Sequence, residues 1–359
     1  MLDKLVRKNI KGFSPYKVQE YKDVVKLDAN ENNNLSYLFN EKLARAIVEL
    51  KINEYPDSDC NELRGLLGEK FGLLPENILI GCGSDQLISV IVNTFIDPGD
   101  SILTFSPSFS MYSISTRMVG GKVIEIPLGE DFKFDYDAFI ESVETQEAKV
   151  IFLCNPNNPT GGIISRKHIK EILDKAESIV VLDEAYIEFD GDSSMDLIEE
   201  YPNLIVLRTL SKAFGLAGAR VGYGVASKEL MNILYKVKPV YNVSSLSQMA
   251  AKIAIKEKEL VDRINFEIKE EREKMFQELN SMENIKVYES HANFLLVEVN
   301  DSKEVFDYLL EKGFLVRYFG QEGPLANHIR ISIGTKEDNQ RVIQVIRDVV
   351  EGQNGKQKM

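Results

Sequence analysis

The feature that most constrains the fold is a series of short runs that are apolar at nearly every position and are separated by amphipathic segments. The runs occupy residues 77–81, 101–105, 122–126, 149–154, 178–186 and 203–208. A strand that is apolar at successive positions is covered on both faces, whereas a strand with one wet face alternates apolar and polar residues. The pattern therefore predicts an α/β fold with a large, doubly wound and mainly parallel sheet.

The segments between these runs have helical periodicity. In residues 165–177, Ser165 is placed to cap a helix, and Ile169, Ile172 and Leu173 share one face. Strand and helix alternate in this way to about residue 225. A long helix is then predicted at 259–282.

The last hundred residues have a different texture. Strand-like runs at 292–299, 314–319 and 328–334 alternate with helical patterns at 303–312 and 336–350, which indicates a smaller α+β domain. We therefore expect two domains. The large α/β domain spans 31–245, and the small one combines 1–30 with 246–359.

Composition excludes several classes of partner. The 359 residues carry 43 basic and 56 acidic side chains, a net charge of −13, which disfavours a nucleic acid or an anionic membrane as principal partner. No apolar run is long enough to cross a bilayer. Cys60, Cys82 and Cys154 form no CxxC pair, and the three histidines are scattered, so we expect a reducing, cytoplasmic location and no metal site.

Polar residues directly after four predicted strands are the candidates for a ligand site, because ligands of open α/β sheets bind beyond the carboxyl ends of the strands. One strand breaks into Gly83, Ser84 and Asp85 where a helix begins, and free N–H groups there favour a phosphate. Asn158 follows another strand in a loop fixed by prolines, where its amide can donate. Taken singly, these segments could be a capped turn and an Asx-Pro turn.

The other two strand ends carry charged side chains. Asp183 ends an apolar run, where a carboxylate is poorly hydrated and needs a cationic or N–H partner. Lys212 follows Ser211 among small and apolar residues, and Arg220, eight positions later, suits bidentate phosphate binding. Taken singly, Asp183 could cap a loop or pair with an arginine, and Lys212 with Arg220 could form a solvated rim.

One molecule accounts for all four strand ends. Pyridoxal 5'-phosphate has a phosphate for Gly83 to Asp85, Ser211 and Arg220, a ring nitrogen for Asp183, a ring oxygen for Asn158 and an aldehyde for Lys212. Lys212 would form a Schiff base with that aldehyde. A low-dielectric site beside other cations would lower the lysine pKa from about 10.4, and the amine could then carry a proton to and from the substrate α-carbon.

Three motifs carry a resemblance to a known family. "NPNNPTG", "VLDEAY" and "TLSKAFGLAGARVG", in this order, resemble the fold-type I pyridoxal-phosphate aminotransferases, and specifically the histidinol-phosphate aminotransferases. The resemblance extends from residues 27–32 to 329–335. It implies that Lys212 is the Schiff-base lysine, that Asp183 is the partner of the pyridinium nitrogen, and that Asn158 and Tyr186 contact the ring oxygen.

The same resemblance implies further roles. Phe109 would stack on the pyridine ring, and Tyr55 would reach the cofactor phosphate from the other subunit of a homodimer. Tyr16 would close over the substrate. Arg330 would bind the α-carboxylate of an amino-acid substrate, and Arg317 the substrate phosphate. Tyr55 and Phe109 would otherwise be ordinary core or surface aromatics.

The resemblance implies transamination of histidinol phosphate with 2-oxoglutarate in histidine biosynthesis, which gives 3-(imidazol-4-yl)-2-oxopropyl phosphate and glutamate. The alternatives are an aromatic aminotransferase or a phospho-amino-acid decarboxylase on the same frame, and, more remotely, a non-catalytic nucleotide-binding module that shares only the sheet. The sequence departs from the usual family residues at five positions, namely Val18, Gln19, Asn33, Gln86 and Phe109.

Overall fold

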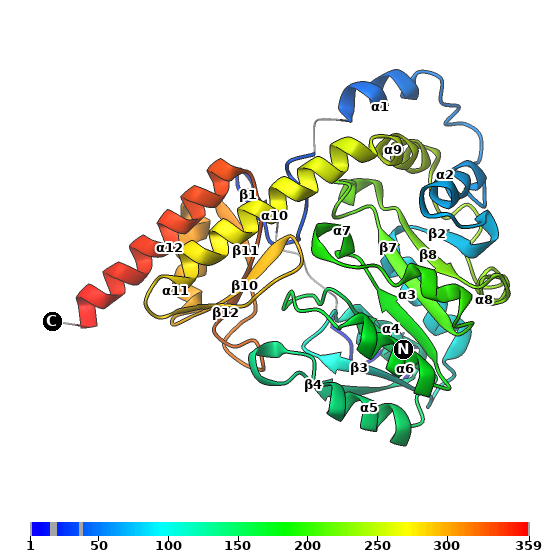
Figure 1. Cartoon of the computed structure of the whole chain (residues 1–359), viewed down its shortest axis with the longest axis horizontal. Helices are drawn as coiled ribbons and strands as arrows, with labels where there is room; N and C mark the ends of the chain where they lie inside the picture. The colour runs from blue at the N-terminus through cyan, green and yellow to red at the C-terminus, as the bar shows by residue number, and fades with distance from the viewer. Residues whose placement is uncertain (1, 15–19, 36–38, 358–359) are drawn as a thin grey trace.

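The computed structural model describes residues 2–14, 20–35 and 39–357, and these residues form two sheets (Figure 1). The larger sheet has the strand order β2-β8-β7-β6-β5-β3-β4. Its strands are β2 (Ile78–Gly81), β3 (Ser101–Ser106), β4 (Lys122–Pro127), β5 (Val150–Cys154), β6 (Ile179–Asp183), β7 (Leu204–Thr209) and β8 (Gly222–Ala226). All neighbours pair in parallel except β8, which is antiparallel to β2 and β7. The predicted α/β fold with a mainly parallel sheet is confirmed.

The middle of the large sheet is covered on both faces. Every residue of β5 and β7 is buried, and successive residues of a strand point to opposite faces. The edge strand β4 has no fully buried residue, so the interpretation of 122–126 as a strand covered on both faces is wrong. The sequence reasoning did not single out β8, because Gly222 and Gly224 interrupt its apolar pattern.

Five helices lie between strands of this sheet along the chain: α3 (Gly83–Phe95), α4 (Met111–Val119), α5 (Tyr136–Thr145), α6 (Arg166–Lys175) and α7 (Ile187–Asp190). Two helices precede β2, namely α1 (Asn40–Ile47) and α2 (Asn61–Phe71), and two follow β8, namely α8 (Lys228–Leu234) and α9 (Ser245–Lys256). Short 3₁₀ turns are η1 (Leu2–Lys4), η2 (Pro75–Asn77), η3 (Glu130–Phe132), η4 (Met195–Glu199) and η5 (Ala217–Ala219). In α6 the Ser165 side chain accepts a hydrogen bond from the His168 N–H, and Ile169, Ile172 and Leu173 are buried, as predicted.

The smaller sheet has the order β1-β11-β12-β10-β9. It contains β1 (Val25–Leu27), β9 (Ile285–Val287), β10 (Phe294–Val299), β11 (Phe314–Tyr318) and β12 (His328–Ser332), with α11 (Ser302–Glu311) and α12 (Lys336–Gln357). β1 is parallel to β11, and the other pairs are antiparallel. The long helix α10 (Lys258–Asn280) runs from α9 toward this sheet and contacts α7, α12 and β9 (Figure 1). α12 continues seven residues past its predicted end at 350.

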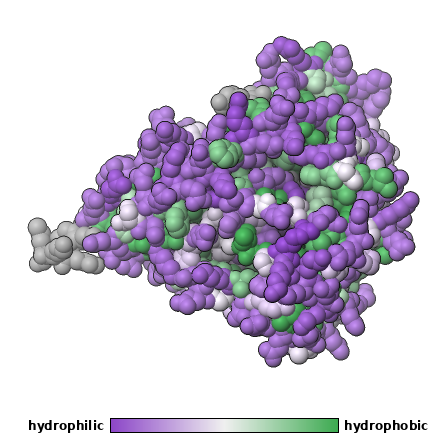
Figure 2. Space-filling model, in the orientation of Figure 1, coloured by the Kyte–Doolittle hydropathy of each residue, from purple (hydrophilic) through white to green (hydrophobic). Residues whose placement is uncertain are grey.

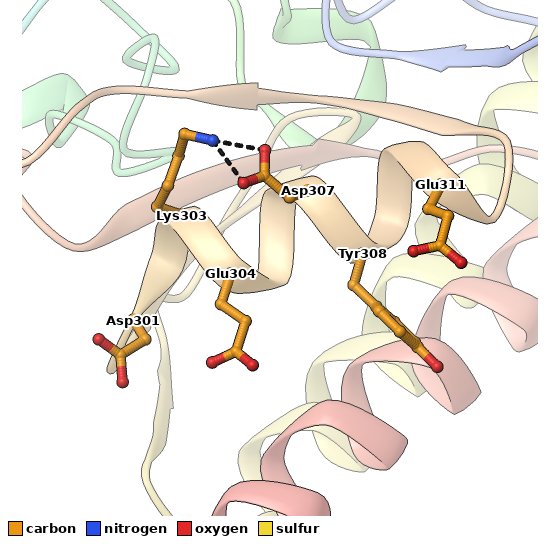
Figure 3. A pocket seen from close by; sticks show the side chains of 6 residues that line it. All are labelled: Asp301, Lys303, Glu304, Asp307, Tyr308 and Glu311. Atoms are coloured by element: carbon orange, nitrogen blue, oxygen red, sulfur yellow. Dashed lines mark hydrogen bonds and ion pairs between the residues drawn. The ribbon is translucent and has the colours of Figure 1, made fainter.

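The surface agrees with the charged composition. The face drawn in Figure 2 is mostly hydrophilic, with apolar side chains in small separate groups. Within the described ranges, no helix is long and apolar enough to cross a membrane. A hollow on α11 is lined by Asp301, Lys303, Glu304, Asp307, Tyr308 and Glu311 (Figure 3). Lys303 donates to Asp307, and four of the six lining residues are acidic, so this hollow does not suit a phosphate-bearing ligand.

A buried ion-pair network braces the strand that precedes Lys212. Arg208 on β7 donates to Glu184 from Nε at 2.8 Å, to Glu188 from Nη1 at 2.7 Å and to Ser193 from Nη2 at 2.8 Å. The Arg208 side chain is 4% exposed and that of Glu184 is 0% exposed. Because the two buried charges satisfy each other, removal of one partner leaves the other charge uncompensated in the interior.

We expect Arg208→Met to lower the free energy of unfolding by about 3–5 kcal/mol, because it leaves the buried Glu184 carboxylate without its cation. Urea denaturation followed by circular dichroism measures the change. The control is Arg347→Met on α12, whose pair with Glu278 is exposed and spans 3.5 Å, so that its loss costs about 0–1 kcal/mol. Equal destabilisation by the two substitutions would contradict the role given to the buried network.

Candidate active site

The carboxyl ends of β2, β5, β6 and β7 lie at one edge of the large sheet. β5, β6 and β7 are parallel, and β2 points the same way because β8 is antiparallel to both β2 and β7. Residue 183 is the last residue of β6, and the residues at 83–85, 158 and 211–212 come within four positions of the ends of β2, β5 and β7. The fold therefore gathers the four predicted segments at the edge where open α/β sheets bind ligands.

The first turn of α3 lies against Arg220 and Gly222, and two glycines make this close approach possible. Gly83 has a φ of +75°, and a Cβ built there would lie 2.6 Å from Arg220 Nη2. A Cβ on Gly222 would lie 2.3 Å from the Ser84 backbone nitrogen. The backbone contact excludes a side chain at Gly222, and the left-handed φ disfavours one at Gly83. The free N–H groups and the dipole of that turn favour a phosphate.

Asp85 contributes to this cradle through its partner. Its carboxylate accepts a hydrogen bond from Arg220 Nη2 at 3.0 Å, and Arg220 Nη1 lies 3.4 Å from Ser211 Oγ. The Asp85 carboxylate thus orients the Arg220 guanidinium. Because this carboxylate would repel a phosphate, only the Asp85 backbone N–H is left to bind one. Gln86, a departure from the family pattern, accepts from the Cys82 N–H at 2.8 Å and from Asn242 Nδ2 at 2.6 Å. It braces the turn.

Asp183 is a buried carboxylate at the end of β6. Its side chain accepts from the Tyr112 hydroxyl at 2.7 Å and from the Ala185 N–H at 3.1 Å, and the residue is 2% exposed. Burial raises its pKa from 3.8 to about 6, and the Tyr112 hydrogen bond is the largest opposing effect. A carboxylate in such a place is suited to bind a protonated ring nitrogen.

Lys212 is partly buried and lies three residues after the end of β7, at the same edge of the large sheet. Its Nζ donates to the Ala29 carbonyl at 2.6 Å and lies 5.8 Å from the centre of the Tyr186 ring. Burial, and next the charge of Arg330, lower the pKa of the ammonium from 10.5 to about 8. The predicted depression of the lysine pKa follows from the same causes in the structure.

The smaller sheet supplies Arg330 from β12. Its guanidinium donates to the Asn158 side-chain oxygen and to the Asp28 carbonyl, and its Cζ lies 5.2 Å from the centre of the Phe294 ring. The residue is 8% exposed. Arg330 therefore joins the two sheets at the predicted site, next to the asparagine expected to contact the ring oxygen.

A buried network that the sequence reasoning did not identify positions Tyr186. Asn30 Nδ2 donates to the Tyr186 hydroxyl at 2.9 Å, and Asn30 Oδ1 accepts from Ser332 at 3.1 Å. The Asn30 carbonyl accepts from Asn293 at 3.0 Å. Because Asn30 donates to the phenol oxygen, the single Tyr186 proton is available to an acceptor in the site. Asn30 stands in the segment "LDANEN", which the resemblance had included without assigning it a role.

The other predicted residues take different positions. Phe109 is partly buried, with its ring 5.6 Å from that of Tyr112 at 84°. Arg317 is exposed on β11, directly opposite Arg330 in the strand register. Tyr55 is 82% exposed and stacks on Tyr241. Tyr16 lies outside the described residues.

The chemistry of this donor set fits pyridoxal phosphate. An arginine and the start of a helix could hold the phosphate, a buried carboxylate could face the ring nitrogen, and Tyr186 and Asn158 could contact the ring oxygen. A lysine of lowered pKa serves the aldehyde. Glycines at 83 and 222 keep the phosphate cradle free of side-chain atoms. Among the described residues there is no cluster of three or more histidines, cysteines or carboxylates that could hold a metal ion.

Comparisons with known proteins point the same way. Residues 22–346 match the family described as aminotransferase class I and II. A histidinol-phosphate aminotransferase from Thermoanaerobacter pseudethanolicus is 42% identical over 354 residues, 98% of this chain and 100% of that protein.

Two solved structures share the fold. The histidinol-phosphate aminotransferase of Sinorhizobium meliloti, determined in complex with pyridoxal-5'-phosphate, has a TM-score of 0.88 and 23% identity, over 97% of this chain and 98% of that one. L-Threonine-O-3-phosphate decarboxylase from Porphyromonas gingivalis has a TM-score of 0.81 and 25% identity, over 91% of this chain and 100% of that one.

We expect Lys212 to react as a neutral amine at lower pH than other lysines. With a pKa of about 8, roughly 10% of this amine is uncharged at pH 7, against roughly 0.03% for a lysine with its ordinary pKa. Reductive methylation of the cofactor-free protein by formaldehyde, read out by peptide mass spectrometry across pH, should give a midpoint near 8 for Lys212.

The internal control is Lys274, an exposed lysine whose pKa is raised by its hydrogen bond to Glu271. Its modification should rise only at distinctly higher pH. A Lys212 profile that coincides with the Lys274 profile would contradict the lowered pKa.

Proposed function

The chain belongs to aminotransferase class I and II, and we propose that it transfers the amino group of histidinol phosphate to 2-oxoglutarate. The products are 3-(imidazol-4-yl)-2-oxopropyl phosphate and glutamate. The protein is a pyridoxal-phosphate-dependent enzyme, and its reaction belongs to histidine biosynthesis. The observation that carries the choice of substrate is the 42% identity, over nearly the whole of both chains, to a histidinol-phosphate aminotransferase.

The geometry of the site supports our proposal for the cofactor-binding residues. Arg220, Ser211 and the backbone at 83–85 would hold the phosphate, and Asp183 the ring nitrogen. Tyr186 and Asn158 would donate to the ring oxygen, with Phe109 against the ring. When bound, pyridoxal phosphate supplies an aldehyde that takes up the amino group and a protonated ring that withdraws electrons from the substrate carbon.

Lys212 has two tasks in this scheme. Its amine must first be neutral to react with a carbonyl, and the apolar surroundings make the neutral form accessible near physiological pH. Once a substrate amine takes its place, Lys212 Nζ can remove the proton from the carbon that bears the amino group and hold it for return. The Ala29 carbonyl, 2.6 Å from Nζ, keeps the amine at the site.

Two arginines on neighbouring strands are suited to both substrates. Arg317 and Arg330 are paired directly across β11 and β12, so their side chains leave the sheet on the same face. Like charges in this arrangement repel unless an anion lies between or beside them. Histidinol phosphate offers a phosphate and 2-oxoglutarate offers carboxylates, and guanidinium groups bind both. We therefore propose Arg317 for the phosphate and Arg330 for the α-carboxylate.

We assign different tasks to the two proposed domains. We propose that residues 31–245 hold the cofactor and that residues 1–30 with 246–359 form the unit that closes over the substrate, with Tyr16 as part of that closure. Contacts of Arg330 with Asn158 and of Asn30 with Tyr186 join the two units at the reacting centre. A cytoplasmic location is consistent with three free cysteines.

A panel of amino donors tests the substrate. With 2-oxoglutarate as acceptor, we expect kcat/KM for histidinol phosphate to exceed that for histidinol, and that for phenylalanine, by at least about a hundredfold, because donors without a phosphate lack the anion proposed for Arg317. Arg317→Gln should raise KM for histidinol phosphate and leave the histidinol value nearly unchanged.

Two results would overturn this assignment. A phenylalanine rate far above the histidinol-phosphate rate would make the enzyme an aromatic aminotransferase. Release of carbon dioxide from O-phosphothreonine, without amino transfer, would make it a decarboxylase like the structural relative from Porphyromonas gingivalis.

We also propose a homodimer in which Tyr55 contacts the cofactor phosphate of the other subunit. Tyr55 stacks on Tyr241 at 4.6 Å between ring centres, yet it is 82% exposed. Exposed apolar residues surround this pair in sequence, among them Val48, Ile52 and Val240, at 83%, 77% and 68% exposure. The stack of Tyr55 on Tyr241 brings these two stretches of the chain together, and exposed apolar residues that lie together are typical of an interface with another protein.

Sedimentation velocity should show twice the chain mass of 40.7 kDa for the native protein. Ile52→Arg should produce monomers with weaker cofactor binding, because it places a charge in the interface. Phe266→Arg, at an exposed apolar residue on α10, is the control and should remain dimeric. A native protein that sediments as a monomer would rule out the shared site.

A further inference from the structure

Tyr112 is a buried tyrosine next to the proposed cofactor site, and neither the motifs nor the proposed mechanism gives it a role. It lies in the first turn of α4 and is 0% exposed. Its hydroxyl donates to Asp183 Oδ2 at 2.7 Å. A phenol buried this completely needs a hydrogen-bond partner, and the partner here is the one carboxylate that the proposed function assigns to the ring nitrogen.

The surroundings of Asp183 make this hydrogen bond consequential. Asp183 Oδ1 accepts from the Ala185 N–H at 3.1 Å and Oδ2 accepts from Tyr112. Within the part of the chain that the structure describes, no lysine or arginine forms an ion pair with this carboxylate. A buried carboxylate without a cation tends to take up a proton, and neutral donors aimed at its oxygens oppose that tendency. Tyr112 is the side chain that does so.

The ring of Tyr112 is fixed on two sides. It stacks on Phe152 of β5 with 4.6 Å between centres and an angle of 11°. It also meets Phe109, the residue expected to lie against the pyridine ring, nearly perpendicularly at 5.6 Å. Because Phe152 stacks on the ring and Phe109 packs against it at a right angle, the hydroxyl has little freedom to leave Asp183. Tyr112 thus links Phe109 and Asp183.

We propose that Tyr112 is a positioning residue: its hydroxyl holds the Asp183 carboxylate ionised and in place, so that the cofactor ring nitrogen stays protonated. The proposal rests on the role of Asp183 in the proposed function. Without the hydroxyl, the carboxylate becomes more basic, and the proton shared between Asp183 and the ring nitrogen moves toward the carboxylate. A ring that is protonated less of the time withdraws electrons from the substrate carbon less strongly. Amino transfer therefore slows, while substrate binding is unaffected.

The test compares Tyr112→Phe with Tyr223→Phe in the holoenzyme. Tyr223 is also buried, and its hydroxyl has no hydrogen-bond partner among the described residues, so its removal controls for the loss of a buried phenol oxygen. Nitrogen-15 NMR of cofactor labelled in the ring reports protonation directly. We expect the signal to shift toward that of an unprotonated pyridine in Tyr112→Phe and to remain unchanged in Tyr223→Phe.

Kinetics give a second readout. We expect kcat to fall by about ten- to a hundredfold in Tyr112→Phe, in line with the loss of a hydrogen bond to a charged group, while KM for the amino donor stays within about twofold. Fluorinated tyrosine at position 112 donates more strongly and should shift the nitrogen signal in the opposite direction. If Tyr112→Phe folds poorly, the fluorinated protein still tests the proposal through the direction of the nitrogen shift.

Asp183→Asn separates failure of this proposal from failure of the function. If Asp183→Asn shifts the ring-nitrogen signal but neither change at position 112 does, the role of Tyr112 is wrong and that of Asp183 stands. If Asp183→Asn leaves the signal as it is in the native protein, Asp183 is not the partner of the ring nitrogen, and the proposal falls with that assignment.

Discussion

The site depends on keeping one amine and one carboxylate away from bulk water without pairing them with each other. Lys212 donates to a backbone carbonyl, and Asp183 accepts from a phenol and a backbone N–H. Burial pushes both groups toward their neutral forms. In the proposed function, that shift gives Lys212 its reactive amine, whereas Asp183 has to stay ionised, and the hydrogen bonds from Tyr112 and the Ala185 N–H favour its ionised form.

The two sheets meet through these same groups. The large sheet presents its strand ends, and the small sheet brings Arg330 and the buried asparagine Asn30 onto them. The carbonyl that receives Lys212 Nζ belongs to Ala29, in the segment that follows β1 of the small sheet. Any motion of the small sheet relative to the large one would therefore change the surroundings of the lysine, the tyrosine and the asparagine of the site together.

The sequence predicted the layers of the fold and the strand-end residues, because all-apolar runs and the polar residues after them are local patterns. It did not predict the hydrogen bonds made by Tyr112 and Asn30, because their partners are 71 and 156 residues away in the chain. The contact of the Asp85 side chain with Arg220 was not predicted either, because the two residues are 135 positions apart. The edge position of β4 and the antiparallel direction of β8 were not predicted either. They depend on how the strands are arranged in the sheet, which the pattern of apolar residues along the chain does not specify.

Reduction of the holoenzyme with sodium borohydride, followed by peptide mapping, is the most direct test of the central claim. The reagent fixes the cofactor to whichever lysine holds its aldehyde. The account predicts that the pyridoxyl group is found on the peptide that contains Lys212 and that Lys212→Ala abolishes this labelling. Stoichiometric labelling of another lysine, with Lys212 unmodified, would contradict it.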